Sequence, residues 1–278
     1  MRLNLRQRTV EREGPWLMGI LNITPDSFSD GGRYLRPDEA LRQAEALVRA
    51  GADIVDVGGE SSRPGAGGIT LEEEMDRVLP VVASIREQFD VLISVDTTKA
   101  ALARAAVEEG GADLVNDISA LRFDERMAET VARLEVPLVL MHMKGTPGTM
   151  QLAPEYTDVV REISEFFAER IEAALAASIQ RERLILDPGF GFGKRLEDNL
   201  ALLRGLGEFR VWELPLLVGL SRKTFLGRVS GEECPAGRDF ETVAAGILAV
   251  QAGADVLRVH DVAAARKSLA VLKAVRGR

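Results

Sequence analysis

Eight short apolar segments recur along the chain, and each is followed by a polar residue or a glycine-rich loop. Most of them are continuous apolar runs without alternation, which is typical of parallel strands buried on both faces. The pattern predicts eight strands of a mostly parallel sheet, at residues 17–21, 54–57, 91–95, 114–115, 137–141, 184–186, 216–218 and 256–259.

Amphipathic helical patterns lie between these segments. The clearest start signal is at Thr70, where Glu73 follows three residues later, as in a capping box. The segment at 154–180 is the longest, and no linker or low-complexity stretch interrupts the alternation of strand and helix. The predicted helices are 38–50, 70–88, 98–110, 124–134, 154–180, 239–252 and 262–275.

A faint internal repeat accompanies this alternation. The frame Gly-Ala-Asp followed by a short apolar run occurs at residues 51–56, 111–116 and 253–258. Each copy is typical of a helix that ends at glycine, a short turn, and then a strand. Five residues after the glycine stand Asp56, Asn116 and Arg258, so we expect these three side chains at equivalent places near the carboxyl ends of their strands.

Eight strand–helix units in about 250 residues indicate an α/β protein, a single (β/α)8 TIM barrel spanning residues 1–278. The alternative is a doubly wound open sheet. No dinucleotide-binding glycine fingerprint follows the first strand, which argues against that alternative. In a barrel the carboxyl ends of all strands meet at one mouth, where the active site forms.

Polar side chains end nearly every apolar run. Asp96 could cap the next helix or lie at the floor of a pocket, and Asp187 precedes a glycine-rich loop with the same two possibilities. Carboxylates together with an amide suit a flat heterocycle with amidine and amide edges. The run-ending residues are Asn22, Asp56, Asp96, Asn116, His142, Asp187, Ser221, Arg258 and His260.

Candidate anion-binding residues lie near the same strand ends. Arg63 stands in the long irregular loop 58–68 and is either an anion clamp or a solvated surface residue. Lys223 follows the seventh strand, where barrels often bind phosphate. Arg258 and His260 are two residues apart on the last strand and therefore point the same way. We expect His142 to be a packed, hydrogen-bonded core residue.

Composition narrows the function classes. The 278-residue chain carries a net charge of −8 without a local run of Lys and Arg, which excludes an extended nucleic-acid surface. Its single cysteine, Cys234, allows no internal disulfide. No apolar run reaches the roughly 20 residues of a membrane span. We expect a cytoplasmic protein with neither nucleic acid nor membrane as partner.

No segment has the residue spacing of a metal cage, a Ser-His-Asp triad or a reactive cysteine. Asn22, helped by Asp56, could still hold a Mg2+ ion whose remaining ligands are water and substrate phosphate.

Several longer motifs carry a resemblance to a known family. The match runs from Met18 to Asp261. It rests on Asn-Ile-Thr-Pro-Asp-Ser-Phe-Ser-Asp-Gly-Gly from Asn22, Asp-Val-Gly-Gly-Glu-Ser-Ser-Arg-Pro-Gly from Asp56, Ser-Val-Asp-Thr from Ser94, Val-Asn-Asp-Ile from Val115, Met-His-Met from Met141, Asp-Pro-Gly-Phe-Gly-Phe-Gly-Lys from Asp187, Ser-Arg-Lys from Ser221 and Arg-Val-His-Asp from Arg258. With these motifs the chain resembles the dihydropteroate synthase family of pterin-binding (β/α)8 barrels.

The resemblance implies a transferase that condenses a dihydropterin methyl pyrophosphate with p-aminobenzoate in folate synthesis, usually as a homodimer. The long 154–180 helix could contribute to the dimer interface. The residues implied for the pterin are Asp96, Asn116, Asp187 and Lys223; for the pyrophosphate, Arg258, His260, Arg63 and Asn22 with its Mg2+; for p-aminobenzoate, Ser62, Pro64, Phe190, Lys223 and Thr224; and for a closing loop, Asp26 and Phe28. The catalytic roles fall to Arg63, Asp96, Lys223 and His260.

Two positions depart from the family pattern. Ser62 stands where the family usually has Thr, and Lys144 stands where it often has Gln, which adds a positive charge near the mouth. The pocket carboxylates come without an evident general base, which favours a dissociative displacement. Two alternatives are a methyltetrahydrofolate-dependent methyltransferase of the same barrel family, which needs no pyrophosphate clamp, and a catalytically silent barrel, which would have lost mouth residues.

Overall fold

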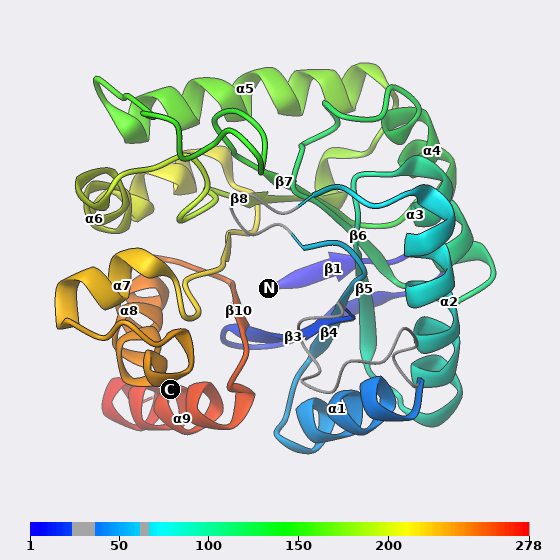
Figure 1. Ribbon diagram of the computed structural model, residues 1–278, viewed down its shortest axis with the longest axis horizontal. Coiled ribbons are helices and arrows are strands. Elements are labelled where there is room, and N and C mark those ends of the chain that lie inside the picture. Colours follow the sequence, from blue (N-terminus) through cyan, green and yellow to red (C-terminus); the bar gives the residue numbers. More distant parts are fainter. Residues whose placement is uncertain (24–36, 62–66, 278) are drawn as a thin grey trace.

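Eight parallel strands form a closed ring in the computed structural model, which describes residues 1–23, 37–61 and 67–277 (Figure 1). Neighbours in the ring are also neighbours in sequence. A bridge between Leu186 and Leu216 closes the ring. The predicted barrel is confirmed. Its strands are β3 (Trp16–Asn22), β4 (Ile54–Gly58), β5 (Leu92–Asp96), β6 (Leu114–Asp117), β7 (Leu138–Met141), β8 (Leu184–Asp187), β9 (Leu217–Val218) and β10 (Val256–Val259).

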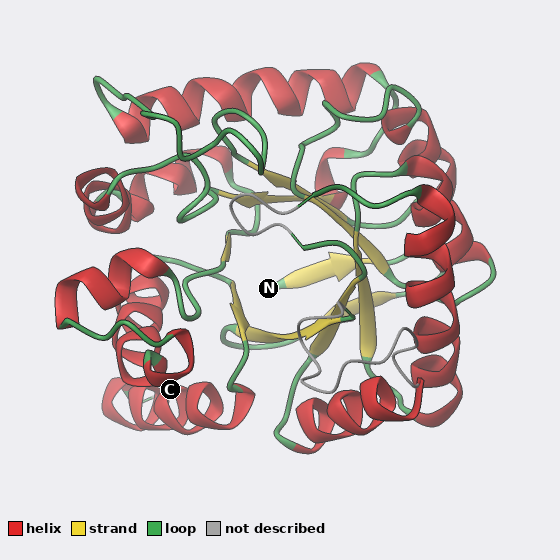
Figure 2. Cartoon of the chain, in the orientation of Figure 1, coloured by secondary structure: helices red, strands yellow, loops and turns green. Residues whose placement is uncertain are grey.

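The helices surround this ring (Figure 2). The capping box is confirmed, since Thr70 Oγ1 accepts from Glu73 N–H at 3.2 Å and Glu73 Oε2 accepts from Thr70 N–H at 3.1 Å. No helix in the described ranges is long and apolar enough to cross a bilayer. The helices are α1 (Pro37–Arg49), α2 (Leu71–Gln88), α3 (Ala100–Glu108), α4 (Met127–Leu134), α5 (Val159–Ala176), α6 (Leu196–Arg204), α7 (Thr224–Ser230), α8 (Asp239–Gln251) and α9 (Val262–Arg276).

The structure corrects the prediction of helices in two places. The helix expected at 154–180 is α5, which begins later because Asp158 is its N-cap, with Oδ1 accepting from Arg161 N–H at 3.1 Å. It ends at Ala176, and the following Ser178 has a φ of 70°. The pattern also missed α6 and α7. Both are short, with 9 and 7 residues, so their periodicity is weak.

An N-terminal hairpin, also not predicted, closes one end of the barrel. Its strands β1 (Arg2–Asn4) and β2 (Thr9–Glu11) pair antiparallel, and β1 lies across the middle of the ring in Figure 1. Leu3 and Leu5 are buried against the inward apolar side chains at the amino ends of the barrel strands. Strands of 3 residues are too short to give a recognisable alternation.

The barrel interior is layered. Side chains alternate along each strand between the interior and the helices. At the amino ends the inward residues are apolar and form one cluster with the hairpin: Met18, Ile54, Leu92, Leu114, Val139, Ile185, Leu217 and Val256. Two residues further along, five of the inward positions are polar, at Asp56, Ser94, Asn116, Asp187 and Arg258. The alternation therefore places polar groups only toward the mouth.

The repeated Gly-Ala-Asp frames tie neighbouring strands together at the amino ends. All three frames begin with a glycine of positive φ, as expected for a helix end: 92° at Gly51, 77° at Gly111 and 109° at Gly253. The aspartate of each frame accepts a hydrogen bond from a backbone N–H near the start of the preceding strand. The bonds are Leu17 N–H to Asp53 at 2.8 Å, Ile93 N–H to Asp113 at 2.8 Å and Leu216 N–H to Asp255 at 2.9 Å.

One arginine completes each frame. It donates both to the frame's aspartate and to the carbonyl oxygen of the frame's glycine. Arg86 does so in the second frame, from α2. Arg210 in the third frame and Arg266 in the first make the same pair of contacts. These arginine clamps lie at the end of the barrel opposite the mouth, where they stabilise the ring without entering the site.

Candidate active site

The three repeat-equivalent residues meet inside the barrel. Asp56 Oδ2 accepts from Asn116 Nδ2 at 3.2 Å and from Arg258 Nε at 2.6 Å. Asp56 is fully buried, and its other oxygen, Oδ1, has no hydrogen-bond partner among the described residues. The expectation that Asp56, Asn116 and Arg258 occupy equivalent places is confirmed. The structure also gives Asp56 a defined task, which is to hold Arg258 and Asn116.

Arg258 also reaches Asp96, with Nη2 2.8 Å from Oδ2. Burial raises the pKa of Asp96 to about 7, and the nearby Asp56 contributes to the rise while Arg258 opposes it. Burial lowers the pKa of Arg258, but Asp56 and Asp96 more than compensate, so the guanidinium stays charged. Asp96 does not cap α3, whose N-cap is Lys99. It instead pairs with Arg258 at the mouth end of the barrel interior.

Asp187 and Lys223 form the second polar group of the pocket. Burial raises the pKa of Asp187 to about 6, against the N–H of Gly189, which donates to Oδ1 at 2.7 Å. Burial, followed by repulsion from Arg258, lowers the pKa of Lys223 to about 8. The Lys223 ammonium lies 4.1 Å from the centre of the Phe192 ring. A flat polar molecule here would meet carboxylate acceptors and an ammonium donor.

His260 is held by Ser221. The backbone N–H of His260 donates to Ser221 Oγ at 3.1 Å, and Oγ lies 2.8 Å from His260 Nδ1. Ser221 Oγ thus contacts both the backbone and the ring of His260. A hydroxyl that donates to Nδ1 leaves Nε2 as the N–H donor of a neutral imidazole. Burial and Arg222 lower the pKa of His260 to about 3. The His260 ring is therefore neutral near pH 7 in this structure.

Only some of the residues implied for p-aminobenzoate and the closing loop lie within the described part of the chain. The Phe190 ring is buried and stacks on Phe225, with ring centres 6.1 Å apart and an angle of 23° between planes. Thr224 is exposed at the first position of α7. The positions Asp26, Phe28, Ser62, Arg63 and Pro64 lie outside the described residues.

Asn22 fits the expected role of a magnesium ligand. It is half-buried at the end of β3, and its register partner on β4 is Gly58, which has no side chain. In residues 1–23, 37–61 and 67–277, no three His, Cys, Asp or Glu side chains come together as a metal cage. One amide oxygen is the kind of donor that Mg2+ uses when water and phosphate supply the other ligands. Of the Asp56 oxygens, Oδ2 is bonded to Arg258 and Asn116, whereas Oδ1 has no partner among the described residues.

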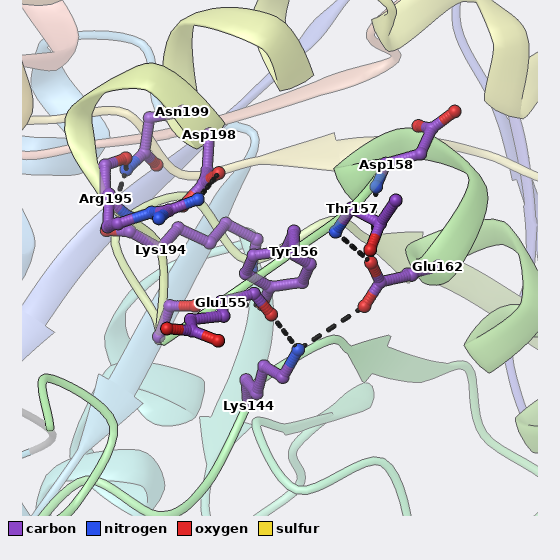
Figure 3. A network of polar contacts seen from close by, with 11 residues as sticks. Lys144, Glu155, Tyr156, Thr157, Asp158, Glu162, Lys194, Arg195, Asp198 and Asn199 are labelled. Carbon is purple, nitrogen blue, oxygen red and sulfur yellow. Dashed lines mark hydrogen bonds and ion pairs between the residues drawn. The ribbon is translucent and has the colours of Figure 1, made fainter. Parts of the chain in front are cut away.

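Lys144 turns away from the pocket groups. Its Nζ donates to the carbonyl of Glu155, lies 3.3 Å from Glu162 and sits 4.1 Å from the centre of the Tyr156 ring (Figure 3). The positive charge expected near the mouth is therefore paired with an acidic residue of α5. His142, by contrast, is the packed residue that was expected, since it is 6% exposed and meets Phe166 edge-on at 4.8 Å.

The sequence reading missed two supporting side chains. The sequence pattern identifies Ser221 only as a strand end, although the side chain bonds to both the backbone and the ring of His260. Lys194 is part of a motif in the sequence, and its buried Nζ bonds to the glycine-rich loop. A Lys that closes a glycine-rich segment is a weak signal on its own, and only the fold of the loop reveals its partners.

Known proteins share both the sequence and the fold. A family model for pterin binding enzymes matches residues 18–260. The dihydropteroate synthase of Escherichia coli K12 is 44% identical over 274 residues, covering 99% of this chain and 96% of the relative. The chain belongs to the dihydropteroate synthase family. It is therefore an enzyme of folate biosynthesis and a transferase.

Solved structures of dihydropteroate synthases agree with this membership over the full length. The Yersinia pestis enzyme, in a sulfonamide drug complex, superposes with a TM-score of 0.94 at 44% identity and full coverage of both chains. The Xanthomonas albilineans enzyme with 4-aminobenzoic acid gives 0.93 at 46% identity, covering 100% of this chain and 98% of the other. A complex of that enzyme with 7,8-dihydropteroate gives 0.91 at 44% identity with full coverage of both chains.

Proposed function

We propose that this chain condenses 6-hydroxymethyl-7,8-dihydropterin pyrophosphate with p-aminobenzoate to form 7,8-dihydropteroate and pyrophosphate. The observation that carries the proposal is the set of buried and half-buried charged and amide groups at the barrel mouth: Asp96, Asn116, Asp187, Lys223 and Arg258. Relatives with 4-aminobenzoic acid and with 7,8-dihydropteroate bound support it.

The pterin ring is assigned to the inner part of the mouth. Its amino and ring N–H groups donate to the carboxylates of Asp96 and Asp187, and Lys223 donates to a ring acceptor. Each charge-assisted hydrogen bond of this kind contributes about 1.5–3 kcal/mol. Arg258 approaches from the Asp56 side, so its guanidinium plane is available to the ring and its charge to the diphosphate.

The pyrophosphate is assigned to the outer part, where Arg258 supplies charge and His260 Nε2 a neutral N–H. Asn22 would hold Mg2+, which neutralises charge on the leaving group when bound. The N-terminus of α9 follows directly, and Asp261 caps it by accepting from Ala264 N–H at 2.9 Å.

We assign a dissociative step to this arrangement. The methylene C–O bond breaks, and its electron pair leaves with the pyrophosphate oxygen. The electron-rich dihydropterin ring, held beside carboxylates, stabilises the cation that remains. The arylamine nitrogen then forms the new C–N bond and releases a proton to water. The described mouth residues present no strong base to the arylamine, and this route requires none.

The proposal extends to a homodimer formed through α7, α8 and α9. Exposed apolar side chains gather on these three helices, at Val229, Phe240, Leu248, Val271 and Val275. The long helix α5, the interface expected from the sequence, exposes only Leu175 among its large apolar residues. Phe240→Asp should yield a monomer in analytical ultracentrifugation, whereas Leu152→Asp, at an exposed position outside these helices, should leave the dimer intact. A monomeric wild-type protein would overturn the proposed homodimer.

The test of the reaction is pyrophosphate release with the pterin pyrophosphate, Mg2+ and p-aminobenzoate, each omitted in turn. We expect release that requires the pterin substrate, depends on Mg2+ and is coupled to formation of dihydropteroate. A protein that binds pterin but releases no pyrophosphate would favour the methyltetrahydrofolate-dependent methyltransferase, which can be assayed by methyl transfer to a corrinoid or thiol acceptor.

A further inference from the structure

We infer that Lys194 is a positioning residue for the pterin site, which fixes Asp187 and Lys223 through the backbone of the glycine-rich loop 188–193. This inference rests on the proposed function, because it concerns the same pocket. Lys194 itself points away from the mouth and is only 4% exposed, so it is not a substrate contact.

The Lys194 amine sits inside the turn that its own loop makes. Its Nζ lies 2.8 Å from the carbonyl oxygen of Gly189, 3.1 Å from that of Phe192 and 2.9 Å from His142 Nδ1. Three acceptors match the three N–H groups of an ammonium ion. The buried Lys194 nitrogen therefore holds the two carbonyls at Gly189 and Phe192, while Gln151, Tyr156 and Asn199 bond to the loop at Gly191 and Gly193.

The two carbonyl bonds do not depend on where the proton resides. Burial lowers the pKa of Lys194, and burial followed by the charge of Lys194 lowers the pKa of His142. A neutral Lys194 amine still has two N–H donors for the Gly189 and Phe192 carbonyls. Lys194 consequently fastens the loop in either state.

One end of the loop transmits this restraint to Asp187. Gly189 accepts from Lys194 with its carbonyl oxygen and donates to Asp187 Oδ1 with its N–H at 2.7 Å. The same residue has a φ of 67°, and a Cβ there would lie 1.9 Å from the His142 carbonyl oxygen. Gly189 thus has no freedom to move without turning the Asp187 carboxylate.

The other end transmits the restraint to Lys223. Phe192 accepts from Lys194 with its carbonyl oxygen, and its ring lies beneath the Lys223 ammonium. Between these points, Gly191 brings the backbone close to Lys223, since a Cβ at Gly191 would lie 3.1 Å from Lys223 Cδ. The loop therefore supports the Lys223 side chain from one side, and the bond from Lys194 to the Phe192 carbonyl helps to fix its position there.

His142 attaches the assembly to the barrel. The backbone N–H of His142 donates to the Asp187 carbonyl oxygen at 2.8 Å, and the His142 ring packs edge-on against Phe166 of α5. Lys194 consequently joins the β8 loop to the end of β7. Loss of the amine would leave the Gly189 and Phe192 carbonyls without this donor and release Asp187 and Lys223 together.

The experiment compares Lys194→Met with wild type in two calorimetric titrations, one with 6-hydroxymethylpterin and one with pyrophosphate plus Mg2+. The loss of two net hydrogen bonds predicts a pterin Kd raised about tenfold. Pyrophosphate affinity should change less than about twofold, because Arg258 and His260 make no contact with the loop. Lys144→Met, which removes a neighbouring amine bonded elsewhere, should change neither affinity.

Equal losses for the two ligands, or unchanged pterin affinity in folded Lys194→Met, would overturn the inference. Failure of the wild type to bind the pterin would instead overturn the proposed function. If Lys194→Met does not fold, His142→Asn and His142→Leu replace it. The Asn variant retains an acceptor for the amine and should bind pterin at least about fivefold better than the Leu variant; equal affinities of these two variants would reject the inference.

Discussion

Arg258 Nη2 lies 2.8 Å from Asp96 Oδ2, so the carboxylate assigned to the pterin is already paired with a guanidinium that comes from β10. The pair is partly buried, and Asp56 shares the same guanidinium. This arrangement holds Asp96 ready as an acceptor while its charge is compensated. Mutation of Asp96 is therefore expected to affect pterin binding and the stability of the protein separately.

Asp96→Asn should weaken binding of 6-hydroxymethylpterin by about 10- to 100-fold, because it replaces a charge-assisted bond by a neutral one at best. Isothermal calorimetry checks the affinity, and circular dichroism checks the fold. Glu129→Gln, on the exposed face of α4, is a matched carboxylate control and should bind like wild type. Unchanged affinity in Asp96→Asn would reject its pterin role.

The same substitution should stabilise the protein at alkaline pH. The folded-state pKa of Asp96, about 7, lies above its unfolded value, so the folded state binds more protons in that window and loses stability as pH rises through about 7. Asp96→Asn removes this loss. Its Tm relative to wild type should be higher at pH 8 than at pH 5, by roughly 2 °C or more. A Tm difference independent of pH would show that Asp96 is not buried as described.

Pterin affinity should rise with pH between about 5 and 7.5, since deprotonation of Asp187 near 6 and of Asp96 near 7 creates the two acceptors. The profile is measured by calorimetry with 6-hydroxymethylpterin. In Asp96→Asn the upper step should vanish and the step near 6 should remain. A profile that falls with pH in the wild type would contradict both assignments.

Ser221→Ala should reduce pyrophosphate affinity about three- to tenfold, because the hydroxyl that bonds to the ring and the backbone of His260 is lost. Ser221→Thr keeps the hydroxyl and is the control. Titration of Mg2+–pyrophosphate into each variant measures the effect. Equal behaviour of the Ala and Thr variants would mean that Ser221 does not act through His260.

Asp113→Ala should lower the free energy of unfolding by about 2–3 kcal/mol, because it leaves the Ile93 N–H without its acceptor and Arg86 without its carboxylate. Urea denaturation measures this value. Glu129→Ala, which breaks the exposed pair with Arg133, should cost less than about 0.5 kcal/mol. If both variants lose equally little, the arginine clamps do not stabilise the ring.

The barrel itself was predictable because local patterns agree with the global fold. Buried parallel strands are continuous apolar runs, and each run stops where the interior becomes polar. The Gly-Ala-Asp frame even predicted that Asp56, Asn116 and Arg258 would be equivalent, and two hydrogen bonds join them. Spacing along the chain fixes position on a strand, so it carries this kind of information well.

What stayed out of reach depends on contacts between distant segments. Lys194 meets His142 from a loop 52 residues away, and Ser221 meets His260 across 39 residues. No local pattern shows such pairs. The neutral state of His260 follows from burial beside Arg222, which composition does not reveal. The hairpin β1–β2 was missed because tertiary contacts, rather than its own sequence pattern, hold it in place.

That hairpin closes the amino-terminal end of the barrel, so the barrel is open at one end only. With Leu3 and Leu5 sealing the far end, everything that enters or leaves must pass the same rim. Under the proposed function, the pterin, which is assigned to the inner part of the mouth, would bind before the arylamine. Dihydropteroate and pyrophosphate would leave through the same opening, so product release, and not only C–O bond cleavage, can limit kcat.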